Sequence, residues 1–357
     1  MIDAHRIVWR NIDSLEFDVT AHLTFSGDNG ATASFLNREN IYSEHYDGRR
    51  TIHRSKYNEV FAPRFTFVKQ DFSDFTEEEN RRILSWLSGS DKPGWLQVYR
   101  DDSNVLTWQC FGNITGIEQY KLGNGRVVGY EFEIETTHPY AFSRKIEITG
   151  QISKPTSITL ESNSDEYSKP LYPTVTIKFG DNIYVPVDVD PTQEPYVMVP
   201  NIIYIYKDRY YINIPSEPHK GIVNVGLILP EVADPKEYYC VDGANIVKKT
   251  STKDADGNLI YVWKTIATVG AAVIIENETA NTKTIITGAA KNEKVILDGM
   301  NKVITVYNEN NEQETRIIGD SFNWTWLPLD YGDNNIVVTG NCDITFEWLE
   351  PRKVGDL

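Results

Sequence analysis

Hydrophobic and polar residues alternate with a period of two along most of this chain. The pattern is clear near the N-terminus in RIVWR, LEFDVTAHLTF and FAPRFTFVKQDF, and it returns in RVVGYEFEIET. Successive side chains of a β-strand point to opposite faces, so this alternation indicates strands with one buried face. The pattern predicts a mainly β chain.

One segment departs from this alternation and predicts a helix over residues 76–88. Thr76 is a suitable N-cap, and Glu79 three residues later completes a capping box. Gly89 supplies a C-terminal stop. The apolar residues fall on one side of this helix: Ile83, Leu84, Trp86 and Leu87.

Turn signals divide the remaining strands. Gly123-Asn124-Gly125 predicts a tight hairpin, and His138-Pro139 ends the strand pattern that follows it. A polar, Ser-rich stretch over 143–170 then suggests a connection between domains. The later short runs, among them KVILDGMNKVITVY, NNIVVTG and CDITFEWLE, have the near-regular spacing of a β-sandwich.

The segment 181–269 separates two of these sandwich strands, LYPTVTIKF and AAVIIENETANTKTIITG. It contains nine of the chain's 20 tyrosines, together with Trp263. Its strand-like run IIYIYKDRYYINI suggests a small β module inserted into a sandwich loop, since exposed loops tolerate insertions. In one extended strand, Tyr204, Tyr206 and Tyr210 would share a face, with Tyr211 on the other.

Composition indicates a folded chain rather than a disordered one. The 357 residues are 40% hydrophobic and 12% aromatic, and this length suggests two or three domains. The net charge of −16 argues against binding nucleic acid over a broad surface, because that requires a basic patch. A solvated acidic surface would explain the charge.

The three cysteines, Cys110, Cys240 and Cys342, lie far apart in the sequence. Their sparse, odd number fits reduced thiols and argues against a disulfide framework or a zinc site. The start MIDAHRIVWR has no apolar leader, and no run approaches 18 apolar residues. We therefore expect synthesis in the cytoplasm and no membrane insertion.

Candidate catalytic and metal-binding groups have simpler explanations. The stretch KDADGNLI, residues 253–260, resembles a calcium loop only superficially, because Gly257 has the wrong position, and a β-turn explains it better. Asp188 and Asp190 would share one face of a strand. Such a carboxylate pair could bind a cation or catalyse glycoside hydrolysis, but paired aspartates on a strand usually form a solvated face.

The six histidines show no metal-ligand spacing, and neither a nucleophile motif nor a phosphate loop is present. We therefore predict no catalytic, metal or cofactor site. The Arg-rich stretch 38–56 looks like an exposed loop or arm without an assignable role. Trp324 and Trp326 would share one strand face, where they could stack on a sugar or pack into the core.

The order of elements resembles one known family. The capped helix, then SGSDKPGWLQVYRDD, the Gly-Asn-Gly hairpin, THPYAFS and the ending TGNCDITFEWLEPRKVGDL together resemble the distal tail proteins (Dit) of siphophages. The resemblance covers roughly residues 1–180 and 270–357.

This resemblance implies a structural virion protein at the tail tip, made in the bacterial host. It implies a homohexameric ring between the tail tube protein and the tail-tip protein, with residues 1–142 forming the ring. DNA would pass the lumen without specific binding, and an acidic conduit would repel it. Residues 143–180 and 270–357 would form a galectin-like sandwich that holds receptor-binding or baseplate proteins.

The insertion leaves a second hypothesis open, a carbohydrate-binding adhesion protein that recognises host glycan. Its candidate contact residues are Tyr204, Tyr206, Tyr210 and Trp263, since tyrosine is common at adaptable interfaces. Alternatively, these rings form the core of the module. A third class, a tail-associated glycosidase, would need paired carboxylates in a cleft.

Overall fold

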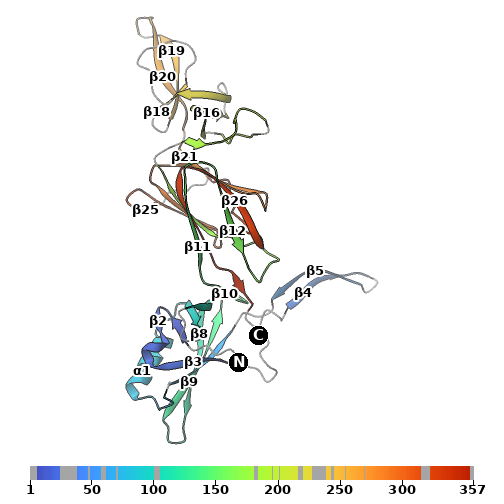
Figure 1. Ribbon diagram of the computed structural model, residues 1–357, viewed down its shortest axis with the longest axis vertical. Coiled ribbons are helices and arrows are strands. Elements are labelled where there is room, and N and C mark those ends of the chain that lie inside the picture. The colour runs from blue at the N-terminus through green and yellow to red at the C-terminus, as the bar shows by residue number, and fades with distance from the viewer. Residues whose placement is uncertain are drawn as a thin grey trace. The chain divides into compact units, whose positions relative to one another are not determined.

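The computed structural model describes residues 6–24, 38–46, 49–57, 62–69, 71–99, 105–180, 184–194, 196–200, 202–215, 220–226, 239–242, 245–253, 255–268, 270–314 and 322–353. Over these ranges the chain is mainly β, which confirms the predicted fold class (Figure 1). The chain divides into two compact units. The first comprises Met1–Lys145, Ser164–Glu166 and Leu349–Leu357, and the second Ile146–Asn163 and Tyr167–Trp348.

A nine-stranded sheet forms the body of the first unit. Its main path runs β2-β1-β7-β8-β9-β6-β3, and β10 pairs with both β8 and β28. These strands are β1 (Arg6–Trp9), β2 (Ile12–Asp13), β3 (Val19–Thr24), β6 (Arg64–Lys69), β7 (Gly94–Tyr99), β8 (Leu106–Lys121), β9 (Val127–Thr136), β10 (Ala141–Phe142) and β28 (Pro351–Arg352). Strands β8 and β9 form the predicted hairpin, in which Gly125 adopts a φ of 82° that favours glycine.

Helix α1 (Glu77–Ser88) confirms the predicted helix and its capping box. The Glu79 amide donates to the Thr76 hydroxyl (3.3 Å), and the Thr76 amide donates to the Glu79 carboxylate (2.7 Å). Ile83, Trp86 and Leu87 are buried in one cluster with residues of the sheet. The Trp86 indole also donates to the Trp9 carbonyl (3.1 Å), so the helix is fixed by both packing and a buried hydrogen bond.

The strand predicted over residues 15–25 begins later than the alternation suggests. Residues Ser14–Phe17 form a short 3₁₀ helix, η1, whose N-cap Asp13 accepts a hydrogen bond from the Leu15 amide (3.0 Å). Asp18 then turns the chain with a φ of 53°, and β3 starts at Val19. The cap at Asp13 overrides the local strand pattern because it satisfies a helical N–H.

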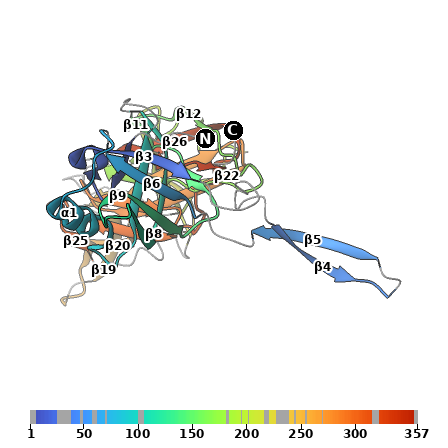
Figure 2. The same cartoon turned by 90° about the horizontal axis from the view of Figure 1, so that it is seen from below.

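The Arg-rich stretch forms a hairpin rather than an irregular loop. Strands β4 (Arg38–Glu44) and β5 (Arg50–Tyr57) make a two-stranded antiparallel sheet of their own (Figure 2). The side chains described near its tip are exposed, including Tyr46 and Ile52. The expectation of an exposed arm therefore holds for these residues, while the backbone is regular.

The second unit contains the predicted β-sandwich. Its six-stranded sheet has the order β11-β27-β13-β23-β24-β25, and its four-stranded sheet has the order β12-β26-β21-β22. The strands are β11 (Ile146–Ile152), β12 (Thr156–Ser162), β13 (Thr174–Phe179), β21 (Ala271–Asn277), β22 (Thr282–Ala289), β23 (Lys294–Asp298), β24 (Val303–Tyr307), β25 (Gln313–Glu314), β26 (Gly332–Gly340) and β27 (Cys342–Trp348). The inward residues of both sheets share one core that includes Ile177, Phe346, Ile275 and Val338.

A separate seven-stranded sheet lies between β13 and β21 in sequence. Its order follows the chain through β14 (Tyr184–Pro186), β15 (Ile203–Tyr206), β16 (Arg209–Ile214), β17 (Gly221–Gly226), β18 (Tyr239–Asp242), β19 (Asn245–Lys253) and β20 (Leu259–Thr268). Part of this segment packs on the outer face of β21, where Val187 and Tyr204 share a cluster with Ala272 and Ile274. Strand β21 is therefore buried on both faces.

Candidate functional site

The tyrosine-rich run forms a tight hairpin instead of the single strand expected from its sequence. Lys207 and Asp208 adopt φ values of 48° and 61° and turn the chain between β15 and β16. Tyr204 consequently lies directly opposite Tyr211. Opposed residues of an antiparallel pair point to the same side, so Tyr211 shares the face of Tyr204 and Tyr210 does not. The predicted three-tyrosine face is wrong.

Tyr204 belongs to the core. Its side chain is completely buried, and its hydroxyl accepts a hydrogen bond from the Val199 amide (3.0 Å). Burial raises the pKa of Tyr204. Its ring meets that of Tyr196 edge-on at 5.9 Å. A buried and hydrogen-bonded tyrosine cannot touch a host molecule, so the prediction of Tyr204 as a contact residue is wrong.

The other predicted contact residues are half-buried and do not form one patch. Tyr206 lies at the turn, with the Lys207 ammonium 4.8 Å from its ring centre. Tyr210 points to the other face and packs edge-on against Tyr184 (5.4 Å). Trp263 is on β20, separated from β16 by three strands, or roughly 19 Å at normal strand spacing. A host contact through Tyr206, Tyr210 or Trp263 stays a prediction.

Residues 322–329 do not form the strand expected for the tryptophan pair. Trp324 has a φ of 57° and is 62% exposed. Trp326 packs against the sandwich core, and Phe322 contacts both indole rings. The left-handed conformation at Trp324 breaks the alternation, so the two indoles do not form the predicted pair on one face.

The carboxylates at Asp188 and Asp190 lie beyond the end of β14 at Pro186, so they do not lie on the strand expected for them. Asp190 accepts hydrogen bonds from the amide and hydroxyl of Thr192 (3.0 and 2.6 Å), which lower its pKa. It therefore caps a turn. Strands β19 and β20 pair on either side of Gly257, which confirms the turn there, although Asp254 lies outside the described residues.

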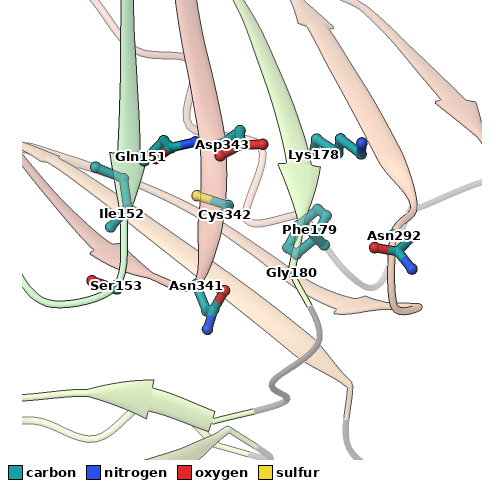
Figure 3. Close-up of a pocket in the computed structure, with 10 residues that line it drawn as sticks. All are labelled: Gln151, Ile152, Ser153, Lys178, Phe179, Gly180, Asn292, Asn341, Cys342 and Asp343. Atoms are coloured by element: carbon teal, nitrogen blue, oxygen red, sulfur yellow. The ribbon is translucent and has the colours of Figure 1, made fainter.

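A recess of about 370 Å³ lies at one end of the six-stranded sheet. Figure 3 shows Gln151, Asp343 and Lys178 side by side on three neighbouring strands, as their pairing requires. Gly180 follows β13 at this end of the sheet. Its lack of a side chain allows close packing, because a Cβ there would come within 2.0 Å of the Asn341 side-chain oxygen.

The only thiol that lines this recess is that of Cys342. Burial, together with the nearby Asp343, raises its pKa to about 12, which makes it a poor nucleophile.

An acidic surface lies on β8 and β9, on the face of the first unit's sheet opposite α1. Glu131, Glu133 and Glu135 alternate along β9 with Phe132 and Ile134, which point into the core.

Glu118 of β8 joins this acidic surface by pairing opposite Glu131. Arg64 offsets part of the charge, lying 2.5 Å from Glu133 and 3.7 Å from Glu131. The sequence EFEIE signals this surface by its period of two, a pattern that by itself predicts only a strand with one polar face.

Neither a metal site nor a membrane helix occurs in the part of the chain that the structure describes. Within those ranges, no three His, Cys, Asp or Glu side chains are placed to hold a metal ion. The helices there are too short or too polar to cross a membrane.

Two structural comparisons found weak similarity over nearly the full length. The Dit protein of phage SPP1 matches at 8% identity over 96% of this chain and 98% of that chain, with a TM-score of 0.49. A chain of the phage P2 baseplate, in its activated conformation with Ca, matches at 8% identity over 97% of this chain and 98% of that chain, with a TM-score of 0.40. No curated protein sequence matches the chain.

Family models give a stronger result. A model described as a phage tail protein N-terminal domain matches residues 3–138. Its companion, described as a phage tail C-terminal domain, matches residues 233–348 and thus includes β18–β20 of the seven-stranded sheet as well as much of the sandwich. Together the two models match well over half of the sequence, and the chain belongs to the phage tail protein family that they describe.

Proposed function

We propose that this phage tail protein is a distal tail protein, a structural hub that surrounds the DNA path at the tail tip. The acidic surface on β8 and β9 carries this proposal. Four glutamates, Glu118, Glu131, Glu133 and Glu135, face outward with Arg64 as the basic residue that pairs with two of them. A wall of this charge repels phosphate, so DNA can slide past it without binding.

The proposed assembly is a homohexameric ring in which residues 1–142 surround the lumen. It sits between the tail tube protein and the tail-tip protein. The sheet supports this arrangement by its construction, since α1 and the core cover one face and the glutamates project from the other. The hub works through its interfaces and channel, and we propose no reaction for it.

We propose that the sandwich of residues 143–180 and 270–357 is galectin-like and holds receptor-binding or baseplate proteins. Residues 181–269 form a module inserted in it. This module covers Ala272 and Ile274, so a deletion of residues 181–269 exposes these two side chains. A deletion that retains the fold must replace both residues with polar ones, because it uncovers their side chains.

A second candidate function is recognition of host glycan by the inserted module. The half-buried positions of Tyr206, Tyr210 and Trp263 support this function, because each residue keeps part of its surface accessible. It is compatible with a hub. A simple lectin, unlike a ring-former, has no need to form a hexamer.

Light scattering and electron microscopy of the purified full-length chain test the hub. Six copies of 40.8 kDa give about 245 kDa and ring-shaped class averages with six-fold symmetry. The full chain is the correct sample because a fragment ending at residue 145 lacks β28, the partner of β10. A strictly monomeric chain at virion-like local concentrations would contradict the proposal.

A further inference from the structure

A groove of about 800 Å³ lies within the second unit, where the segment 187–199 passes the outer face of the four-stranded sheet. Ile274 of β21 together with Val337 and Thr339 of β26 line it on the sheet side. Its volume is in the range of sites that bind a ligand or a short peptide. The groove is distinct from the acidic surface and from the recess shown in Figure 3.

Aliphatic side chains give this groove an exposed apolar surface. Val189 and Val197 are 55% and 84% exposed, and Val199 and Val337 are half-buried beside them. These valines gather along one groove and offer apolar contact area to a binding partner.

Carboxylates surround these valines. Five acidic residues line the groove: Asp188, Asp190, Glu194, Glu276 and Glu278. Lys283 is the one basic residue among the lining side chains, and it is already paired with Glu276 at 2.9 Å. The groove therefore has a strong negative excess.

Two of the carboxylates are available to a ligand. Asp190 already bonds to Thr192, and Glu278 accepts from Asn335. Asp188 and Glu194 are exposed and have no partner among the described residues. A ligand that covers the valines and brings cations to Asp188 and Glu194 would satisfy both features of the groove.

We propose that this groove docks an extended peptide segment of another tail protein, one in which basic and aliphatic side chains alternate. In an extended segment, alternate side chains face opposite ways, so one set can cover the valines while flanking Lys or Arg side chains reach the carboxylates. The inference rests on the proposed hub function, because a hub must hold such partners.

The groove fits other occupants less well. A second copy of this chain offers the groove less charge complementarity than a basic segment does, because it has 51 acidic and 35 basic residues. Polyanionic nucleic acid is excluded because the carboxylates repel phosphate. A sugar usually stacks on an open aromatic face, whereas the Tyr196 ring is half-buried and packs edge-on against Tyr204.

Site-directed cross-linking in assembled phage particles tests the partner. Val197→Cys places an exposed thiol in a chain whose three native cysteines are buried, so a thiol-reactive photo-cross-linker will label it selectively. We expect a cross-link to a segment of another virion protein that contains both basic and aliphatic residues. A cross-link to another copy of this chain, a cross-link to glycan or no cross-link would overturn the proposal.

A binding measurement with defined probes tests the chemistry. We expect the full-length chain to bind a short synthetic peptide of alternating Lys and Val more tightly than peptides of Lys and Ser or of Glu and Val. The double variant Asp188→Asn/Glu194→Gln should weaken Lys–Val binding about tenfold, and added salt should reduce the difference.

A matched control removes the same charge elsewhere on this unit, at Glu309 and Asp343, both exposed. Glu309→Gln/Asp343→Asn should change the binding of the Lys–Val peptide less than about twofold. Equal loss in the two double variants would show general charge attraction and overturn the proposal. Ring formation separates the docking proposal from the hub proposal. A groove variant that forms rings but binds the Lys–Val peptide as well as the wild type does contradicts docking alone, whereas a wild-type chain that forms no ring contradicts the hub.

Discussion

The Asn277 amide donates a hydrogen bond of 3.1 Å to the side-chain oxygen of Asn334, and both residues are completely buried in the sandwich. Asn277 also donates to the Pro328 carbonyl (2.7 Å). The Asn334 amide lies 2.8 to 3.3 Å from the carbonyls of Asp330, Gly332 and Leu160. Through these hydrogen bonds the two asparagines connect the loop before β26 to strands β12 and β21.

We predict that Asn334→Ala destabilises the sandwich by about 3 kcal/mol, because it leaves several buried backbone groups without a partner. Chemical denaturation followed by tryptophan fluorescence measures this change. Asn310→Ala, at an exposed turn, is the matched control and should have almost no effect. Similar stabilities for the two variants would show that the buried pair contributes little.

The stability of the first unit should depend on pH through Glu79. The Lys69 ammonium (2.8 Å), followed by the Thr76 amide, lowers the pKa of Glu79 below its ordinary value of 4.5. A lowered folded-state pKa stabilises the protein above the unfolded-state pKa, and this contribution is lost as pH falls through the folded-state pKa.

Glu79→Gln should therefore be less stable than the wild type at pH 7, and the difference should shrink as the pH falls below about 4.5. Thermal unfolding at a series of pH values measures it. The control is Glu78→Gln in the same first turn, which is exposed and keeps the capping box. A pH-independent difference between wild type and Glu79→Gln would contradict the linkage.

Local signals explain which elements the sequence could predict. The helix α1 and the β8–β9 hairpin have strong signals of their own, a capping box at Thr76 and Glu79 and a Gly-Asn-Gly turn. Alternation indicates the mainly β fold, and the near-regular spacing of the later short strands indicates the β-sandwich. The matches to phage tail domain models confirm the family-level recognition.

The β15–β16 turn could not be predicted in the same way. Lys207 and Asp208 adopt positive φ values without the glycine or asparagine that usually marks such a turn. The continuous strand pattern therefore predicts one face shared by Tyr204 and Tyr210, which the turn does not allow. Burial of Tyr204 depends on Ala272 and Ile274, which are distant in sequence, so only the tertiary structure reveals it.

We expect Tyr204 and Tyr206 to respond differently to alanine substitution. Tyr204→Ala should cost about 4 kcal/mol of stability, since it removes a fully buried ring and leaves a cavity. Tyr206→Ala should cost much less, because its ring is half-buried. Denaturation midpoints of the two variants measure the difference, and comparable losses would contradict the burial assigned to them.

Adsorption of phage to host cells tests the remaining contact residues. If the module recognises host glycan, Tyr206→Ala or Trp263→Ala should weaken adsorption while the particles assemble normally. Leu122→Ala is a suitable control, since this exposed side chain lies on the first unit. Unchanged adsorption in both module variants would remove the glycan hypothesis and leave the hub unaffected.

The acidic surface makes the last prediction. Glu118→Lys/Glu135→Lys changes the charge of each copy by about four units on the face proposed to line the DNA path, where lysines would bind passing phosphates. We expect DNA ejection from intact particles to slow several-fold at low salt and to recover at high salt, because released counterions drive such binding. A fluorescence assay of ejection triggered in vitro measures the rate. Glu309→Lys/Asp343→Lys makes the same charge change on the second unit and should leave the rate unaltered. If both double variants slow ejection equally, or if neither does, the surface on β8 and β9 does not line the DNA path.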